Sequence, residues 1–190
     1  MGTEFELKYR APHPGVLDEI LRGRRPAEFD MVTTYFDTPE GSLSAQKWTL
    51  RVRKENDASI VSCKTPGDTH VRGEWETPAQ EPLGALETLV ALGAPKELLE
   101  IQSLVPVCGA KFHRRAVTLD LGDARVELAC DQGVLTGGGR ELPIWEVEVE
   151  LKSGNPDSVT HYAQELARHY HLVAESKSKF QRANALSGRI

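Results

Sequence analysis

Two short segments, far apart in the sequence, carry an acidic side chain at every second residue. Glu4-Phe5-Glu6-Leu7-Lys8 lies at the start of the chain, and Trp145-Glu146-Val147-Glu148-Val149-Glu150-Leu151-Lys152 lies near its end. Alternate residues of a β-strand point to opposite faces, so each segment predicts a strand with one apolar and one charged face. A single such strand is most simply a half-buried strand with a solvated polar face. Two of them in one small protein favour a cation-binding site, because aligned carboxylates repel each other unless cations neutralise them.

Basic side chains follow the same two-residue spacing in other segments. Arg51 and Arg53 share one face of a predicted strand, Lys64 ends the next strand, and Lys177 and Lys179 lie near the C-terminus. A barrel that turned these charged faces inward would have a lumen with an acidic side and a basic side. Such a lumen suits a polyanion together with a divalent cation. Carboxylates bind Mg²⁺ or Mn²⁺, and arginine and lysine bind phosphate.

The elements that must position these residues are mostly short strands separated by turn residues, which is typical of an antiparallel sheet or barrel. Strands are predicted at residues 4–8, 31–36, 48–54, 59–64, 71–76, 110–121, 124–131 and 145–152. Helical spacing of apolar residues predicts helices at residues 16–21, 82–92, 95–101 and 156–170. Asn155 is expected to cap the last of these helices. The predicted helices could cover the apolar outer face of the barrel.

The composition is that of a globular protein with a real core. The chain has 190 residues, of which 39% are hydrophobic and 27% charged, and its formal net charge is −5. This charge gives no general case for binding nucleic acid or a membrane, and no apolar run is long enough to span a bilayer. The sequence shows neither a secretory leader nor a Cys-x-x-Cys pair among Cys63, Cys108 and Cys130. We therefore expect a cytoplasmic protein with reduced thiols.

Motifs of several other chemistries are missing from the sequence. There is no Gly-x-x-x-x-Gly-Lys-Ser/Thr loop, and Gly137-Gly138-Gly139 lacks a following lysine. The six histidines include no His-Glu-x-x-His pair, and no Gly-x-Ser-x-Gly segment is present. These absences leave the charged rows as the principal candidates for chemistry.

A series of short motifs covers nearly the whole chain in a fixed order. In sequence order they are Glu4-Phe5-Glu6-Leu7-Lys8, Tyr35-Phe36-Asp37-Thr38-Pro39, Leu50-Arg51-Val52-Arg53, Lys64, Arg72-Gly73-Glu74, Arg114, Asp131-Gln132-Gly133, Glu146-Val147-Glu148-Val149-Glu150 and Ser178-Lys179. This ordered set resembles the CYTH superfamily, the triphosphate tunnel metalloenzymes, whose signature is Glu-x-Glu-x-Lys. The resemblance implies an α+β fold: a closed eight-stranded antiparallel β-barrel with a charged lumen and with helices packed outside.

The resemblance also implies roles for individual residues, and one residue can have more than one role. The expected metal ligands, for Mg²⁺ or Mn²⁺, are Glu4, Glu6, Asp131, Glu146, Glu148 and Glu150, although which members of the 146–150 row bind directly stays open. The expected triphosphate-binding residues are Lys8, Arg51, Arg53, Lys64, Arg114, Lys179 and Arg182. The residues expected to take part in catalysis are Glu4, Glu6, Lys8, Lys64, Glu148 and Glu150.

Within this family the sequence is most similar to bacterial inorganic triphosphatases. The resemblance therefore implies metal-dependent hydrolysis of inorganic triphosphate to pyrophosphate and phosphate. Thiamine triphosphate or another organic triphosphate is an alternative substrate. Class IV adenylate cyclases share the fold but typically have a His-Phe pair shortly before the signature, and here Met1-Gly2-Thr3 stand there instead, which disfavours cyclase activity. A non-catalytic polyphosphate-binding module is a further alternative. We expect a single CYTH domain over residues 1–190 without an additional CHAD domain, acting on a small triphosphate and not on nucleic acid or a membrane.

Overall fold

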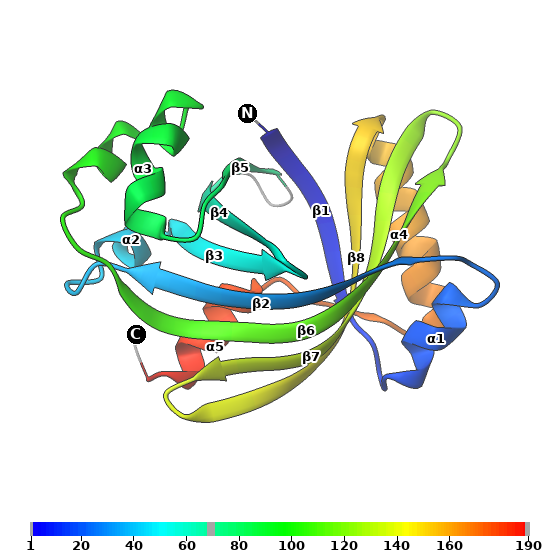
Figure 1. Ribbon diagram of the computed structural model, residues 1–190. Coiled ribbons are helices and arrows are strands. Elements are labelled where there is room, and N and C mark those ends of the chain that lie inside the picture. The colour runs from blue at the N-terminus through cyan, green and yellow to red at the C-terminus, as the bar shows by residue number, and fades with distance from the viewer. Residues whose placement is uncertain (1, 68–70, 189–190) are drawn as a thin grey trace.

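Eight antiparallel strands form a closed barrel in the computed structural model, which describes residues 2–67 and 71–188 (Figure 1). The strand order is β5-β4-β3-β2-β6-β7-β8-β1, and pairing between β1 and β5 closes the barrel. The ninth strand, β9, pairs with the end of β1 outside this circle. The strands are β1 (Gly2–Arg10), β2 (Ala27–Asp37), β3 (Thr49–Glu55), β4 (Ala58–Thr65), β5 (Val71–Pro78), β6 (Val105–Asp120), β7 (Ala124–Gly137), β8 (Arg140–Gly154) and β9 (Val173–Ala174).

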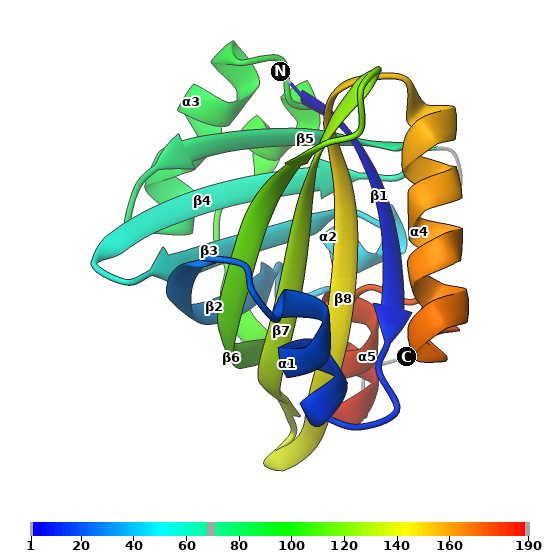
Figure 2. The same cartoon turned by 90° about the vertical axis from the view of Figure 1, so that its right-hand side faces the viewer.

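Two groups of helices cover the apolar outer face of the barrel, as predicted. The helices are α1 (Gly15–Leu21), α2 (Ser42–Ala45), α3 (Pro82–Ala91), the 3₁₀-helix η1 (Lys96–Glu100), α4 (Pro156–Tyr170) and α5 (Lys179–Leu186). Figure 2 shows α1 in front of β7 and β8, and α4 alongside β1. Their apolar residues, such as Leu17 and Val159, form one core with the outward side chains Leu7, Val147 and Val149. Helices α2, α3 and η1 form a second core over β3 and β4.

Helix α5 packs differently, against the concave side of the barrel. Phe180 and Ala183 lie in a third apolar cluster with Tyr35, Phe112 and other inward-facing residues of β2, β6, β7 and β8. The rings of Tyr35 and Phe180 are 5.2 Å apart between centroids. One end of the barrel interior is therefore filled by an apolar plug, and the charged residues gather in the remaining part.

The predicted elements are confirmed in kind, although several strands are longer than the sequence patterns indicated. Strand β6 begins at Val105 and β7 continues to Gly137, because the long hairpins β6–β7 and β7–β8 keep pairing beyond the alternating segments. The cap at Asn155 is confirmed by its side chain, which accepts a hydrogen bond from the Asp157 amide at 3.0 Å. Helices α2 and α5 and strand β9 were not predicted. The domain predicted over residues 1–190 includes residues 1, 68–70 and 189–190, which lie outside the described residues.

Within the part of the chain that the structure describes, no helix has both the length and the apolar character needed to cross a membrane.

Close approach of two strands gives a testable consequence for stability. A Cβ atom added at Gly133 on β7 would lie 2.1 Å from the Lys111 carbonyl oxygen and 2.5 Å from the Phe112 Cα atom on β6. Backbone atoms cannot move aside cheaply, so Gly133→Ala is expected to lower the free energy of unfolding by about 1–3 kcal/mol or more. Gly84→Ala on α3 is the matched control, because no described atom lies within 4 Å of its added Cβ. That variant is expected to gain about 0.5–1 kcal/mol from helix propensity. Urea unfolding measures both changes, and equal effects of the two substitutions would contradict the packing argument.

Candidate functional site

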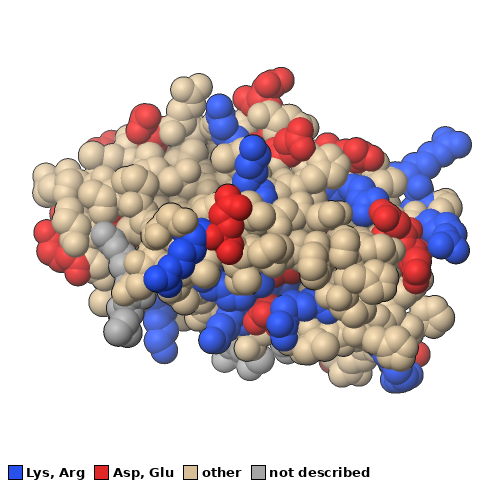
Figure 3. All heavy atoms as spheres, turned by 90° about the horizontal axis from the view of Figure 1, so that it is seen from below, with Lys and Arg blue, Asp and Glu red and all other residues tan. Residues whose placement is uncertain are grey.

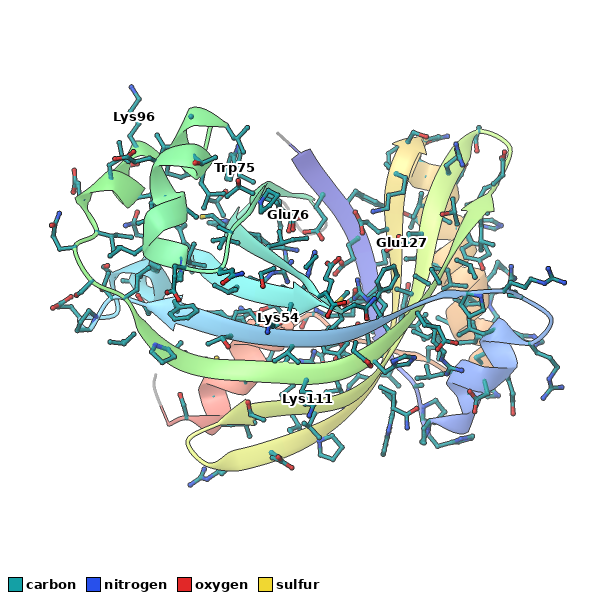
Figure 4. All side chains as sticks on the ribbon, viewed as in Figure 1. Lys54, Trp75, Glu76, Lys96, Lys111 and Glu127 are labelled. Atoms are coloured by element: carbon teal, nitrogen blue, oxygen red, sulfur yellow. The ribbon has the colours of Figure 1, made fainter. Side chains whose placement is uncertain are left out.

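A polar cavity of about 290 Å³ occupies the charged part of the barrel interior. Its walls come from inward-facing residues of β1 to β8 together with the start of α5. In Figure 4, Glu76 on β5 and Glu127 on β7 mark two sides of this lining, whereas Lys54 and Lys111 lie on the outer face. On the outer surface seen in Figure 3, acidic and basic side chains are intermingled. Charge is therefore sorted by sign inside the barrel rather than on that surface.

One acidic group in the cavity contains a carboxylate, Glu6, that has no cationic partner among the described residues, whereas its neighbours Glu4 and Glu150 each pair with a lysine. Carboxylate oxygens of Glu4, Glu6 and Glu150 lie within 4.8 Å of one another. Glu6 forms no hydrogen bond or ion pair with any described residue. Burial and the neighbouring carboxylates of Glu148 and Glu4 raise the pKa of Glu6 to about 7. Burial also raises the pKa of Glu150, although Lys152 donates a hydrogen bond to it at 3.0 Å. This concentration of carboxylate oxygen fits a hard divalent cation.

A second acidic group is fully paired with cations. Asp131, Glu146 and Glu148 surround the Lys179 ammonium, whose Nζ atom is 2.9, 2.9 and 2.6 Å from their respective oxygens. Arg114 donates two hydrogen bonds to Asp131, at 2.8 and 2.7 Å, and also contacts Glu148. Burial alone would raise the pKa of Glu148, but Lys179 and Arg114 hold that pKa well below its ordinary value. The same carboxylates raise the pKa of Lys179 well above its ordinary value, against the effect of burial.

The wall formed by β3 and β4 is basic. Arg51 donates a hydrogen bond to Ser62 at 2.8 Å and forms an ion pair with Glu74 at 3.3 Å. Arg53 pairs with Glu55 at 2.5 Å, but its buried Nε–H has no acceptor among the described residues. Burial and the neighbouring Arg51 guanidinium lower the pKa of Arg53. Arg53 therefore lines the cavity and keeps one N–H donor that no described residue accepts.

Two further lysines of the cavity differ in how far they are paired. Lys64 on β4 lies 2.7 Å from a Glu4 oxygen and 3.4 Å from Glu74. Lys8 on β1 forms no ion pair with any carboxylate of the described residues. Burial, and the nearby charge of Lys179, lower the pKa of Lys8. Lys8 and the Nε of Arg53 are thus available for an anionic ligand.

The structure brings most of the predicted residues together around one cavity. The lining contains Glu4, Glu6, Lys8, Arg51, Arg53, Lys64, Arg114, Glu148, Glu150 and Lys179. Asp131 and Glu146, both fully buried, and Arg182 lie behind this lining, next to α5. Asp131 and Glu146 therefore reach the cavity only through the cations Arg114 and Lys179, and Arg182 is connected to it only through its ion pair with Glu146.

Several residues of the lining were not singled out as site residues. Glu55, Glu76 and Lys152 line the cavity. Glu55 and Lys152 have the same parity along their strands as the predicted site residues Arg53 and Glu150, and Glu76 has the parity of Glu74 in the Arg72-Gly73-Glu74 motif. Strict alternation along β3, β5 and β8 could have identified them. Phe180 also lines the cavity, but it was not predicted, because no helix was predicted at residues 179–186.

The CYTH domain family matches residues 2–183 of the chain. The chain belongs to this family. An inorganic triphosphatase from Haemophilus influenzae is 31% identical to it over 160 residues, which is 82% of this chain and 46% of that protein. The chain thus spans about half the length of this CYTH relative.

Solved structures share the fold of this CYTH chain. HpAC1 from Hippeastrum, a proposed adenylyl cyclase found to have a dominant triphosphatase activity, has a TM-score of 0.69 at 20% identity, covering 98% of this chain and 97% of HpAC1. PH1819 from Pyrococcus horikoshii OT3 has a TM-score of 0.64 at 20% identity, covering 98% and 99% of the two chains. At these identities the likeness establishes the fold alone.

The raised pKa of Glu6 predicts an opposite pH dependence to that of an ordinary carboxylate. Between its ordinary value of 4.5 and about 7, native Glu6 binds more protons than in the unfolded chain. Its contribution to the free energy of unfolding therefore falls as pH rises through this range, by about 1–3 kcal/mol in total. Glu6→Gln, in chelator, is expected to become more stable relative to the unsubstituted protein at pH 8 than at pH 5.

Urea unfolding of both proteins at the two pH values measures this difference. Glu141→Gln, a substitution of an exposed glutamate on β8, serves as the control and is expected to show no such pH-dependent gain. Equal behaviour of the Glu6 and Glu141 variants would contradict the assignment of a raised pKa to Glu6.

Proposed function

We propose that the protein hydrolyses inorganic triphosphate to pyrophosphate and phosphate inside the barrel, with Mg²⁺ or Mn²⁺ as cofactor. One observation carries the proposal. A single cavity is lined by the Glu6 carboxylate, which has no cationic partner among the described residues, by the Lys8 ammonium, which has no ion-pair partner among them, and by Arg53, whose Nε–H has no acceptor among them. A binder of anions alone would gain nothing from the carboxylates. A ligand that brings a cation and a polyanion together would complete both sets.

The basic residues would hold the substrate. Lys8 and Arg53 would bind phosphate oxygens directly, and Arg51, Lys64, Arg114 and Lys179 would place further positive charge along the same cavity. Phosphoryl transfer depends mainly on positioning and electrostatic stabilisation. These cations would orient the terminal phosphorus and offset the negative charge that develops on the pyrophosphate leaving group while water attacks and the bridging P–O bond breaks.

The acidic residues would hold the metal. Glu4, Glu6 and Glu150 supply the fitting donor set, and Glu148 borders it while paired with Lys179 and Arg114. When bound, a divalent cation neutralises phosphate charge and lowers the pKa of coordinated water. Excess carboxylate around the site could accept the proton that the attacking water releases.

We place this activity in the cytoplasm, on a small-molecule substrate. The cysteine spacing lacks a disulfide framework, and Cys63 and Cys130 are buried thiols whose pKa burial raises to about 12. Thiols with such a raised pKa are not nucleophiles at neutral pH, so Cys63 and Cys130 take no part in the proposed reaction.

Phosphate release tests the proposed reaction directly. Inorganic triphosphate, thiamine triphosphate and ATP are compared with Mg²⁺, Mn²⁺ or chelator, and the products are identified. We expect metal-dependent turnover to be fastest on inorganic triphosphate, giving equal amounts of pyrophosphate and phosphate. Faster turnover of an organic triphosphate, or cyclic AMP from ATP, would replace the substrate assignment. Binding without turnover of any substrate would indicate a polyphosphate-binding module.

Substitutions of two neighbouring residues on β3, one facing the lumen and one on the outer surface, can be compared in the same assay. Arg53→Ala is expected to lower kcat/KM for inorganic triphosphate by about 10–100-fold, because a hydrogen-bonded charge contributes roughly 1.5–3 kcal/mol. Lys54→Ala removes the adjacent charge on the exposed outer face and is expected to leave kcat/KM unchanged. An unchanged kcat/KM for the Arg53 variant would remove this residue from the site.

Glu6→Gln is expected to lose most metal-dependent turnover while staying folded.

A further inference from the structure

Asp131, Glu146 and Arg182 lie behind the cavity lining, and ion pairs connect the two carboxylates to cations of α5. Glu146 on β8 is fully buried, and its oxygens contact two cations of α5: the Lys179 ammonium at 2.9 Å and the Arg182 guanidinium. These contacts are close ion pairs rather than well-aligned hydrogen bonds. Arg182 also lies 3.9 Å from Glu175, which in turn pairs with Arg10 at 3.3 Å.

This group of ion pairs stands where the C-terminal segment joins the barrel. The Glu175 amide donates a hydrogen bond to the Lys8 carbonyl at 2.9 Å, directly after β9 has paired with Tyr9 and Arg10 of β1. Ser178 and Gln181 then form a capping box that begins α5. The backbone of a proposed phosphate-binding residue, Lys8, and the helix that carries another, Lys179, are thus fixed together.

Glu146 differs from Glu6 in the charge that surrounds it. Glu6 has no ion-pair partner among the described residues, whereas Glu146 meets two cations and does not border the cavity. A divalent cation at Glu146 would have to displace both Lys179 and Arg182. A buried carboxylate of this kind is retained only with its partners, because removing one partner leaves an uncompensated buried charge.

We propose that Glu146 is a positioning residue and not a metal ligand. Together with Arg182 it holds α5 on the barrel so that the Lys179 ammonium faces the phosphate-binding cavity. Asp131 acts alongside it from β7, holding Lys179 and Arg114 in the same layer. This inference rests on the proposed function for the identity of the anion that Lys179 meets, but the anchoring of α5 stands independently of it.

The test compares Glu146→Gln with Arg182→Gln, Arg182→Lys and the surface control Glu141→Gln. Three properties are measured: Mn²⁺ affinity by electron paramagnetic resonance, affinity for inorganic triphosphate in chelator by calorimetry, and amide hydrogen exchange across residues 179–186. For Glu146→Gln and Arg182→Gln we expect about tenfold weaker triphosphate binding and about tenfold faster exchange in α5, with Mn²⁺ affinity unchanged. Arg182→Lys keeps the charge beside Glu146 and is expected to restore most of both losses.

The outcomes separate the two roles of Glu146. About tenfold weaker Mn²⁺ binding by Glu146→Gln, with unchanged exchange in α5, would overturn the inference and make Glu146 a metal ligand. Unchanged exchange in Arg182→Gln would also overturn it, and this variant decides the matter if Glu146→Gln does not fold. Failure of the unsubstituted protein to bind triphosphate would reject the proposed function instead, and the exchange measurements would still test whether Glu146 and Arg182 hold α5.

Discussion

Burial of many charges inside one small barrel is the constraint on which the rest of the structure depends. Ionised side chains lose favourable hydration when they leave water, so each buried charge needs a partner of opposite sign. The barrel meets most of this requirement with ion pairs between elements: Lys64 on β4 with Glu4 on β1, Arg51 on β3 with Glu74 on β5, and Lys179 on α5 with carboxylates of β7 and β8. Apolar side chains on the outer faces of the strands pack against helices. The helical layers are therefore needed before the lumen can be polar.

These charges are not all paired to the same extent: the group around Lys179 is fully ion-paired, whereas the group around Glu6 is not. Around Lys179, three carboxylates and three cations satisfy each other and fix α5 against the strands. Around Glu6, carboxylates crowd together and raise its pKa to about 7, while Lys8 and the Nε of Arg53 have no partner among the described residues. The first group is ion-paired without a ligand, whereas the second group has charges that a cation and an anion bound together would neutralise.

The eight barrel strands and the longer outer helices could be predicted from the sequence, because two-residue alternation and helical spacing are local signals. Helix α5 was missed, since its eight residues carry charges that resemble an exposed basic tail. Ser178 followed by Gln181 three residues later is a capping-box signal that could have indicated it. The different environments of Glu146 and Glu6 could not be predicted. Both belong to alternating acidic rows, and only the docking of α5, which brings Lys179 and Arg182 to Glu146, separates them.

Thermal unfolding of the protein in chelator, with Mg²⁺ alone, with inorganic triphosphate alone and with both, tests the central claim most directly. A ligand that binds only the folded state raises the unfolding midpoint in proportion to its occupancy and affinity. If Mg²⁺ at the Glu6 group and triphosphate at Lys8 and Arg53 bind as one complex, the two ligands together will raise the midpoint by more than the sum of their separate effects. No change in the midpoint, or separate effects that merely add, would contradict the claim that the lumen is a joint site for metal and triphosphate.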